Sequence, residues 1–306
     1  MSRKHSKRNL TIAAVAVLCI AVFTAAFAGN AVNSAVSRVF NSVGNTAADG
    51  FDTSKDFVKI MDVGQGDGIL IYSNGCSAVI DAGLASKAND ICLDLDGAGI
   101  KDIDAFIITH LHADHAAGLP RIAERYKIDN LILPEIEENA EAAQAVNEAK
   151  QLVASQKGNV YTAVQGMNFE IGEFEITILA YYDEMSGENN KSIITMAEIG
   201  GLKFLFTGDA ESEAERALLD EGLNVDCDVL KVGHHGSNSS SVKAFLKAAS
   251  PEFAAISVGK DNMYSHPSKK VTDALSSCGA EIFRTDLDGD IVFYVENGKI
   301  KPKTER

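Results

Sequence analysis

The chain has 306 residues, of which 46% are hydrophobic and 23% are charged, and its formal net charge is −15. This length and apolar content suit one large domain or two small ones, and they exclude a disordered or collagen-like chain. The acidic balance provides no general electrostatic attraction to nucleic acid or to anionic lipid, so any anionic substrate would have to be bound locally.

The first 28 residues are expected to lie outside the folded domain. Four basic residues precede an uncharged apolar run at 11–28, which ends in a small-x-small cleavage pattern. This predicts a secretory signal peptide or, without cleavage, a single membrane anchor, with the remainder secreted or membrane-anchored on the extracytoplasmic side. Without this leader, 24 basic and 43 acidic residues remain, a net charge of −19. Residues 29–55, rich in Asn, Ser, Ala and Gly, are expected to be a linker.

The folded domain is predicted to cover residues 56–306 and to open with three short strands. Apolar runs at 57–63, 69–72 and 77–81 indicate these strands, with a glycine-rich turn at 64–68. Aspartates lie at the expected strand ends, where a carboxylate can orient a metal-bound histidine or simply belong to a turn. They are Asp62, Asp67 and Asp81.

The densest group of candidate metal ligands is the segment 109–115 (THLHADH), which follows an apolar strand. His110 and His112 are two residues apart, so on an extended strand end their side chains point to the same side. Asp114 and His115 stand where the next helix should begin. Three of the seven histidines of the chain lie here, and imidazole and carboxylate suit zinc, iron or manganese. The segment therefore predicts a metal site.

The rest of the chain repeats one construction, in which an apolar strand leads into a loop with histidine or aspartate and then into a helix. Periodicity predicts helices at 86–95, 115–127, 137–155 and 211–220, and further strands at 131–133, 174–179, 193–197, 201–207, 228–232 and 254–258. This places Asp209, His234, His235 and His266 at strand ends, as with His110. Loops at one edge of a sheet are where functional sites are usually built.

The candidate ligands are too many for one tetrahedral ion. They are His110, His112, Asp114, His115, Asp209, His234 and His235. Two divalent ions, roughly 3.5–4 Å apart and bridged by one carboxylate, would use them in a hydrolytic displacement. Asp209 is the natural bridge, because it lies alone after its strand. A metal-bound water would then act as the nucleophile.

In these motifs the chain resembles the metallo-β-lactamase fold, whose HxHxDH signature matches His110 to His115 at every specified position. More narrowly, it is similar to the extracytoplasmic hydrolase domain of the ComEC-type DNA-internalisation competence proteins. The matching segments span roughly residues 56–295 and include 62–67 (DVGQGD), 81–83 (DAG), 189–192 (NNKS), 206–211 (FTGDAE), 230–237 (LKVGHHGS), 264–267 (YSHP) and 285–289 (TDLDG). The resemblance extends to the hydrolase and not to DNA transport.

The resemblance implies an α/β (α+β) protein, an αββα four-layer sandwich with the metals at one edge between its two sheets. It implies that His110 and His112 hold one ion, and that Asp114, His115 and His235 hold the other, with Asp209 bridging and His234 beside the substrate. Many family members supply a third histidine to the first ion, from a region where this chain has 189–192 instead. We therefore expect a more open first site, zinc or manganese as the two metals, and no β-lactam hydrolysis.

The expected function is that of an extracytoplasmic metal-dependent phosphodiesterase or nuclease acting on DNA. The catalytic candidates are Asp114, His234 and His266, and the substrate-binding candidates are Asn190, Ser192, Lys231, Ser237 and Tyr264, with Lys260, Lys269 and Lys270 as further possible backbone contacts. One alternative is hydrolysis of a cell-surface phosphodiester, such as phosphorylcholine or teichoic acid, or of a lactone. Another is a non-catalytic, metal-stabilised binding module of a DNA-uptake apparatus. No protein partner is evident from the sequence.

Overall fold

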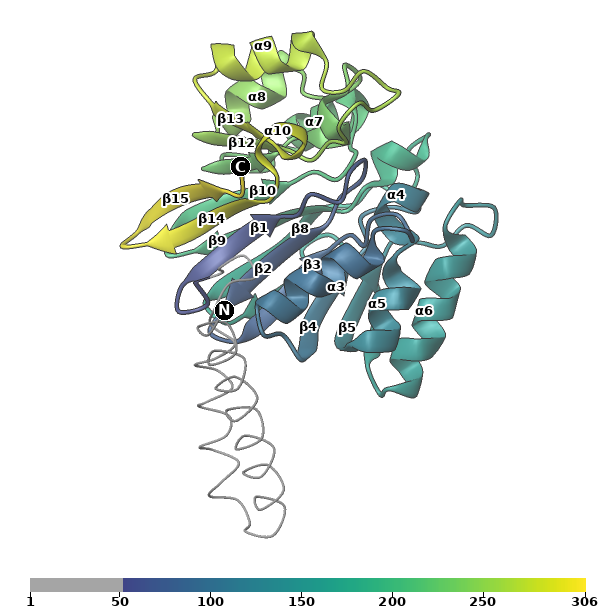
Figure 1. The fold of residues 1–306 in the computed structure, drawn as a ribbon. Coiled ribbons are helices and arrows are strands. Elements are labelled where there is room, and N and C mark those ends of the chain that lie inside the picture. The colour runs from purple at the N-terminus through teal and green to yellow at the C-terminus, as the bar shows by residue number, and fades with distance from the viewer. Residues whose placement is uncertain (1–51) are drawn as a thin grey trace, which may run out of the picture. The chain divides into compact units, whose positions relative to one another are not determined.

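The computed structural model describes residues 52–306, which form two β-sheets packed face to face with helices on both outer faces (Figure 1). The predicted leader and nearly all of the predicted linker lie outside the described residues. Within residues 52–306, no helix has the length and apolar character needed to cross a membrane. The first strand begins at Asp56.

The first sheet has eight strands in the order β15-β14-β1-β2-β3-β4-β5-β6. Strands β3 to β6 run parallel to one another, and the other neighbours are antiparallel. The bounds are β1 (Asp56–Ile60), β2 (Ile69–Ser73), β3 (Cys76–Ile80), β4 (Asp102–Ile107), β5 (Lys127–Leu133), β6 (Asn159–Thr162), β14 (Ile291–Glu296) and β15 (Lys299–Thr304). The last two strands return beside the first one, so this sheet joins the two ends of the described chain.

The second sheet has seven strands in the order β13-β12-β11-β10-β9-β8-β7. They are β7 (Asn168–Ile171), β8 (Phe174–Ala180), β9 (Ile194–Ile199), β10 (Leu202–Phe206), β11 (Val229–Lys231), β12 (Phe253–Ile256) and β13 (Glu281–Arg284). Strands β10 to β13 are parallel, so their carboxyl ends lie at one edge of the sheet. Ligands of open α/β sheets bind at this kind of edge.

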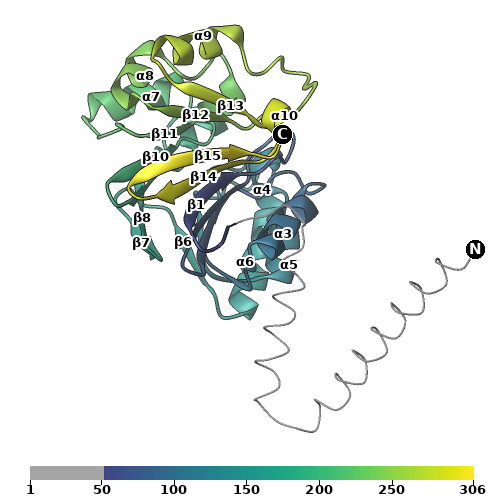
Figure 2. The ribbon, with the colours of Figure 1, turned by 60° about the vertical axis from the view of Figure 1, so that its left-hand side comes forward.

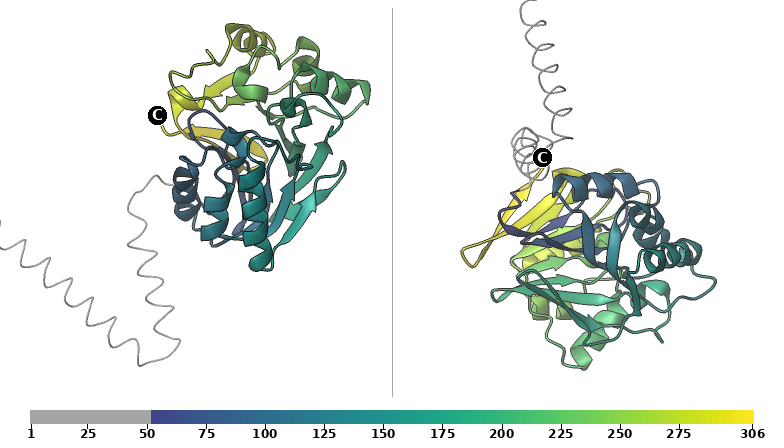
Figure 3. Two further views of the ribbon diagram at one scale, coloured as in Figure 1. Left: turned by 90° about the vertical axis from the view of Figure 1, so that its right-hand side faces the viewer. Right: turned by 90° about the horizontal axis from the view of Figure 1, so that it is seen from below.

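Side-chain alternation along the strands builds three buried cores, one between each pair of layers. In β1, Phe57 packs toward the helices, whereas Val58 and Ile60 pack against the other sheet. The outer layers are α3 (Ala88–Gly97), α5 (Leu119–Arg125) and α6 (Ala143–Ser155) on the first sheet, and α7 (Ser212–Asp220), α8 (Lys243–Ala249) and α9 (Lys269–Ser277) on the second (Figures 2 and 3). The predicted αββα sandwich is confirmed.

Two predicted helices differ from the structure next to the histidine-rich loop. The helix expected at 115–127 is divided into α4 (Ala113–Ala116) and α5, and Gly118 lies between them. A Cβ on Gly118 would lie 2.1 Å from the carbonyl oxygen of Ala82, so the chain must pack tightly here. The helix expected from residue 137 begins only at Ala143, because the preceding turn is bound to the loop through the backbone of Ala142 and Leu111.

Candidate metal centre

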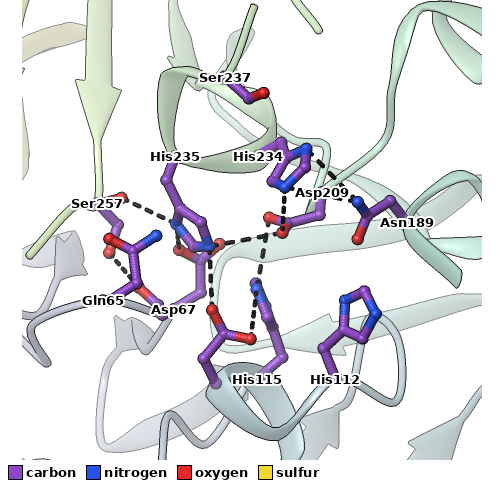
Figure 4. Close-up of polar contacts among 12 residues, drawn as sticks. Gln65, Asp67, His112, His115, Asn189, Asp209, His234, His235, Ser237 and Ser257 are labelled. Carbon is purple, nitrogen blue, oxygen red and sulfur yellow. Dashed lines mark hydrogen bonds and ion pairs between the residues drawn. The ribbon is translucent and has the colours of Figure 1, made fainter. Parts of the chain in front are cut away.

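The candidate ligands meet at one edge of the sandwich because each follows the carboxyl end of a strand. The histidine-rich loop follows β4, Asp209 follows β10, and His234 and His235 lie in the 3₁₀ turn η2 (Gly233–Gly236) after β11. Figure 4 shows His115, His235 and Asp209 pointing toward one another from these three places. Segments more than ninety residues apart in the sequence therefore contribute to one cluster.

Four side chains form the tighter half of the cluster. Nε2 of His115 lies 3.4 Å from Oδ1 of Asp209 and 4.0 Å from Oδ1 of Asp114. Nε2 of His235 lies 3.5 Å from Oδ2 of Asp114 and 3.5 Å from Oδ2 of Asp209. His115, His235 and Asp209 are buried, and Asp114 is partly exposed. Two imidazoles and two carboxylates at these distances surround a volume that a divalent ion would fill.

Unpaired buried atoms support the fit to a metal. Nε2 of His115, Nε2 of His235 and Oδ1 of Asp209 have no hydrogen-bond partner in the described part of the chain. A buried polar atom without a partner costs about 1–3 kcal/mol, so a cluster of such atoms is stable only with a ligand between them. The donor set and its orientation therefore fit a divalent metal ion.

Neighbouring groups set the tautomers of the two buried histidines. Nδ1 of His115 lies 2.8 Å from Oδ2 of Asp81, and Nδ1 of His235 lies 3.0 Å from the carbonyl oxygen of Ser257. Each Nδ1–H donates to its oxygen acceptor, which directs each Nε2 into the cluster. Asp81 also accepts hydrogen bonds from the backbone and hydroxyl of Thr109, at 2.8 Å each.

Opposite charges compensate one another in this cluster. Burial disfavours the imidazolium form of His115, but Asp209 and Asp81 outweigh it and raise the pKa of His115 well above its usual range. Burial likewise disfavours ionised Asp209, yet His235 and His115 hold its pKa well below the usual value. For Asp114 the neighbouring His235 and His115 imidazoles outweigh the effect of burial and lower the pKa. The carboxylates are thus ionised and available to a cation.

A second group of donors also approaches Asp209. Nε2 of His110 is 3.0 Å from Nδ1 of His112 and 4.0 Å from Oδ2 of Asp209. Burial lowers the pKa of His110 well below its usual range, so its imidazole is neutral, as a metal ligand must be. Nε2 of His234 approaches the same Asp209 oxygen, at 3.8 Å. Asp209 is therefore the one carboxylate of this cluster that both donor groups share.

The consecutive histidines of η2 play different geometric roles. Both have left-handed backbones, with φ of 48° for His234 and 53° for His235. His235 is buried, whereas His234 is 23% exposed and binds Oε1 of Glu211 through Nδ1 at 3.1 Å. Such strained residues cost about 1–3 kcal/mol each and are concentrated at functional sites. The turn buries one imidazole in the cluster and places the other, partly exposed, in the wall of the cavity beside Asp209.

A cavity of about 220 Å³ connects the cluster to solvent. Its lining combines the exposed side of the candidate ligands with four further side chains. The lining residues are Gln65, His112, Asp114, Glu141, Asp209, His234, His235, Tyr264 and His266. No lysine or arginine of residues 52–306 belongs to this lining. The metal centre is thus open on one side, as a catalytic site requires.

Residues 61–260 match the model of the metallo-beta-lactamase superfamily. The chain belongs to this superfamily. It is 29% identical over 267 residues to ComE operon protein 3 of Bacillus subtilis (strain 168), covering 80% of this chain and 34% of that protein. It is 30% identical over 255 residues to Competence protein ComA of Neisseria gonorrhoeae, covering 81% and 34%. The resemblance inferred from the motifs is confirmed, and the chain spans about a third of the length of these relatives.

A solved structure shows the same fold at low sequence identity. CmlA, a diiron beta-hydroxylase from Streptomyces venezuelae, superposes with a TM-score of 0.52 at 15% identity, covering 79% of this chain and 54% of that one. The metallo-β-lactamase fold is thereby supported by the shape of the chain as well as by its sequence.

Of the three aspartates expected to orient histidines, two contact the cluster. Asp81 binds His115, and Oδ1 of Asp67 lies 3.5 Å from Nδ1 of His235. Asp62 does not reach a histidine. Its carboxylate instead accepts from the backbone of Gly64 and pairs with Arg306, so the expected orienting role of Asp62 is corrected.

For four of the five expected substrate-binding residues, burial or contacts within the chain contradict the expected role. Lys231 is 0% exposed and its Nζ pairs with Asp67 at 2.7 Å, so it cannot meet a substrate. Asn190 is buried and its Oδ1 accepts from the backbone N–H of Glu211. Ser192 is buried and accepts from the N–H of Asp209 at 3.0 Å.

Ser237 binds Ser239, with 2.9 Å between the hydroxyl oxygens, and Ser237 is not part of the cavity lining. Tyr264 is therefore the only one of the five that lines the cavity. The further lysine candidates are exposed and lie outside the cavity lining, and Lys269 pairs with Asp273. The sequence of a motif does not distinguish a buried residue that supports the site from a residue that contacts the substrate.

The site also includes residues, in the cavity lining or in contact with His234, that the sequence analysis did not single out. Glu211 contacts His234 and Gln65 lines the cavity, and both lie inside matched motifs that could have drawn attention to them. Asn189, from the matched segment 189–192, approaches His234 at 3.5 Å. Glu141 lines the cavity and accepts from the N–H of Ala113. Nothing in the amphipathic pattern around residue 141 indicated this contact.

Proposed function

We propose that the chain is a metal-dependent phosphodiesterase that hydrolyses DNA at a site for two divalent ions, zinc or manganese. The observation that carries the proposal is the unpaired, buried nitrogen and oxygen atoms that converge around Asp209 at the floor of an open cavity. The relatives named for competence support DNA as the substrate. The basic and apolar leader supports action outside the cytoplasm.

In this proposal, Asp114, His115 and His235 would hold one ion, His110 and His112 would hold the other, and Asp209 would contribute to both. The ions, when bound, supply positive charge to the phosphate and lower the pKa of a water molecule. Asp81 and Ser257 fix the rings of His115 and His235, so that these donors need no rearrangement. That preorganisation lowers the cost of charge development at the phosphate.

His234 is the better placed of the two candidates for proton donation to the leaving oxygen. Its Nδ1 is held by Glu211, which keeps Nε2 directed to the cavity floor near Asp209. His266 lines the same cavity with its ring centroid 5.6 Å from that of His234. Burial lowers the pKa of His266, which leaves it neutral and less suited to donate. We assign the proton donor to His234 and the contact with the substrate to His266.

A small phosphodiester of the cell surface is the second candidate substrate. The absence of lysine and arginine from the cavity lining within residues 52–306 favours it, since a long polyanion gains affinity mainly from basic contacts. A purified protein loaded with manganese or zinc, given linear DNA and bis(p-nitrophenyl) phosphate, separates these cases. We expect cleavage of both by the wild type and of neither by Asp209→Ala. Cleavage of the dye ester alone would favour the small substrate, and cleavage of neither, with metal bound, would refute the phosphodiesterase.

A further inference from the structure

The loop between β12 and α9 carries two exposed apolar side chains, and one of them lines the cavity. Met263 is 85% exposed and Tyr264 is 60% exposed. Tyr264 lines the cavity, so its ring lies beside the position where a substrate would enter.

The loop is held rigid by the side chain of Asn262. Its Nδ2 donates to the carbonyl oxygens of Gly259 at 2.9 Å and His266 at 2.7 Å. Its Oδ1 accepts from the N–H groups of Tyr264 at 3.2 Å and His266 at 3.0 Å. One side chain therefore closes the loop at four points, so that Tyr264 is presented in a fixed orientation.

Tyr264 rests on His266 as a stacked pair. The ring centroids are 5.7 Å apart and the rings are inclined by 26°. His266 in turn lies edge-on to His234, which approaches Asp209. A series of ring contacts thus extends from His234, beside Asp209, to Tyr264. One face of the Tyr264 ring is occupied by His266, and its exposure leaves the remaining ring surface to solvent.

Because of the charge of the cavity, the ring of Tyr264 would be the main source of affinity for a nucleic acid besides the metals. Among the described residues, the lining contains carboxylates, including Glu141, and neither lysine nor arginine. Phosphates flanking the scissile bond therefore find no basic side chain there, and the usual salt-dependent contribution is lost. Stacking of a base on an aromatic side chain contributes about 1–3 kcal/mol and needs no charge.

We propose that Tyr264, stacked on His266, is a platform for an unpaired nucleobase next to the scissile phosphodiester. This rests on the proposed function and specifies its substrate as single-stranded. A base within a duplex is already stacked on both faces and would have to be unstacked, at a cost of a few kcal/mol. The tyrosine hydroxyl is not needed, because the contact is made by the ring.

Binding of phosphorothioate oligomers, which resist hydrolysis, tests the platform directly. Fluorescence anisotropy on the metal-loaded protein should give an oligothymidylate a Kd about 5- to 150-fold tighter than an abasic oligomer of equal length and charge. Tyr264→Ala should remove that difference, and Tyr264→Phe should keep it. Tyr161→Ala is the matched control, because Tyr161 is also exposed (40%) but lines a different cavity.

Equal Kd values for the two oligomers in the wild type, or an unchanged difference in Tyr264→Ala, would overturn the platform. The same comparison with cleavable phosphodiester oligomers separates it from the proposed function. Base-dependent binding without cleavage would refute the phosphodiesterase and leave the platform intact. Cleavage with the same KM for both oligomers would refute the platform and leave the phosphodiesterase intact.

Discussion

Oδ2 of Asp81 lies 2.8 Å from Nδ1 of His115, and both side chains are fully buried. The same carboxylate accepts two hydrogen bonds from Thr109, which begins the histidine-rich loop. Asp81 therefore fixes both the ring of a candidate ligand and the start of the loop that carries it. An acceptor behind a ligating histidine holds its tautomer and raises its basicity.

We expect Asp81→Asn to weaken metal binding about 10- to 100-fold, because one oxygen becomes an amide donor that faces other donors. Isothermal titration calorimetry with zinc or manganese measures this. Asp62→Asn is the control, since Asp62 is a strand-end carboxylate that contacts Gly64 and Arg306 instead of a histidine. A folded Asp81→Asn variant with wild-type affinity would contradict the orienting role.

A second prediction concerns Gly66, which packs directly on the metal loop. Its φ is +128°, and a Cβ there would lie 2.2 Å from the carbonyl oxygen of Asp114. Gly66→Ala must therefore displace Asp114, and we expect loss of metal affinity together with about 2–5 kcal/mol of stability.

Gly99→Ala is the matched control for Gly66→Ala. Gly99 also has a positive φ, of +74°, but an added Cβ would have nothing within 4 Å. It should lose about 1–2 kcal/mol from backbone strain and keep its metal affinity. Urea unfolding and metal titration of both variants decide the matter. Equal metal affinities in the two would mean that Asp114 does not depend on the close approach of Gly66.

The third prediction concerns the buried ion pair of Lys231 and Asp67, with Nζ 2.7 Å from Oδ2. Both side chains are almost completely buried, so Lys231→Met leaves an uncompensated charge. We expect a loss of about 3–5 kcal/mol in the free energy of unfolding. Lys269→Met, which breaks an exposed pair with Asp273, should cost about 0–1 kcal/mol. Similar losses in the two variants, measured in urea, would show that burial of the pair does not matter.

The sequence predicted the elements best where local pattern and tertiary environment agree. The run at 69–72 became β2, and the alternating run at 174–179 became β8. The sequence-based prediction was wrong where a contact distant in sequence sets the boundary of an element. At Ala142 the N–H donates to the carbonyl oxygen of Leu111, and α6 begins only after it. The motif ligands could be found because strand ends converge in this fold. The burial of Lys231 could not, since its partner Asp67 is supplied by a loop 164 residues away in the chain.

The last prediction follows from Glu215, a carboxyl group that is 1% exposed in α7. Its oxygens accept from the N–H groups of Ser241 at 2.6 Å and Val242 at 2.8 Å, directly before α8. Burial raises the pKa of Glu215 from 4.5 to about 7, although these two hydrogen bonds lower it. The folded chain therefore binds this proton more tightly than the unfolded chain does.

Stability from Glu215 is consequently complete below about pH 4.5 and is lost as the pH rises through about 7, an effect on the order of 3 kcal/mol. Glu215→Gln keeps an acceptor for α8 and removes the titration. We expect the free energy of unfolding, measured in urea, to fall less between pH 5 and pH 8 in the variant than in the wild type. The difference should be roughly that amount. Comparing the two proteins cancels contributions from the other titrating groups. Glu213→Gln, on the exposed face of the same helix, should follow the wild type, and a Glu215→Gln profile parallel to the wild type would contradict the raised pKa.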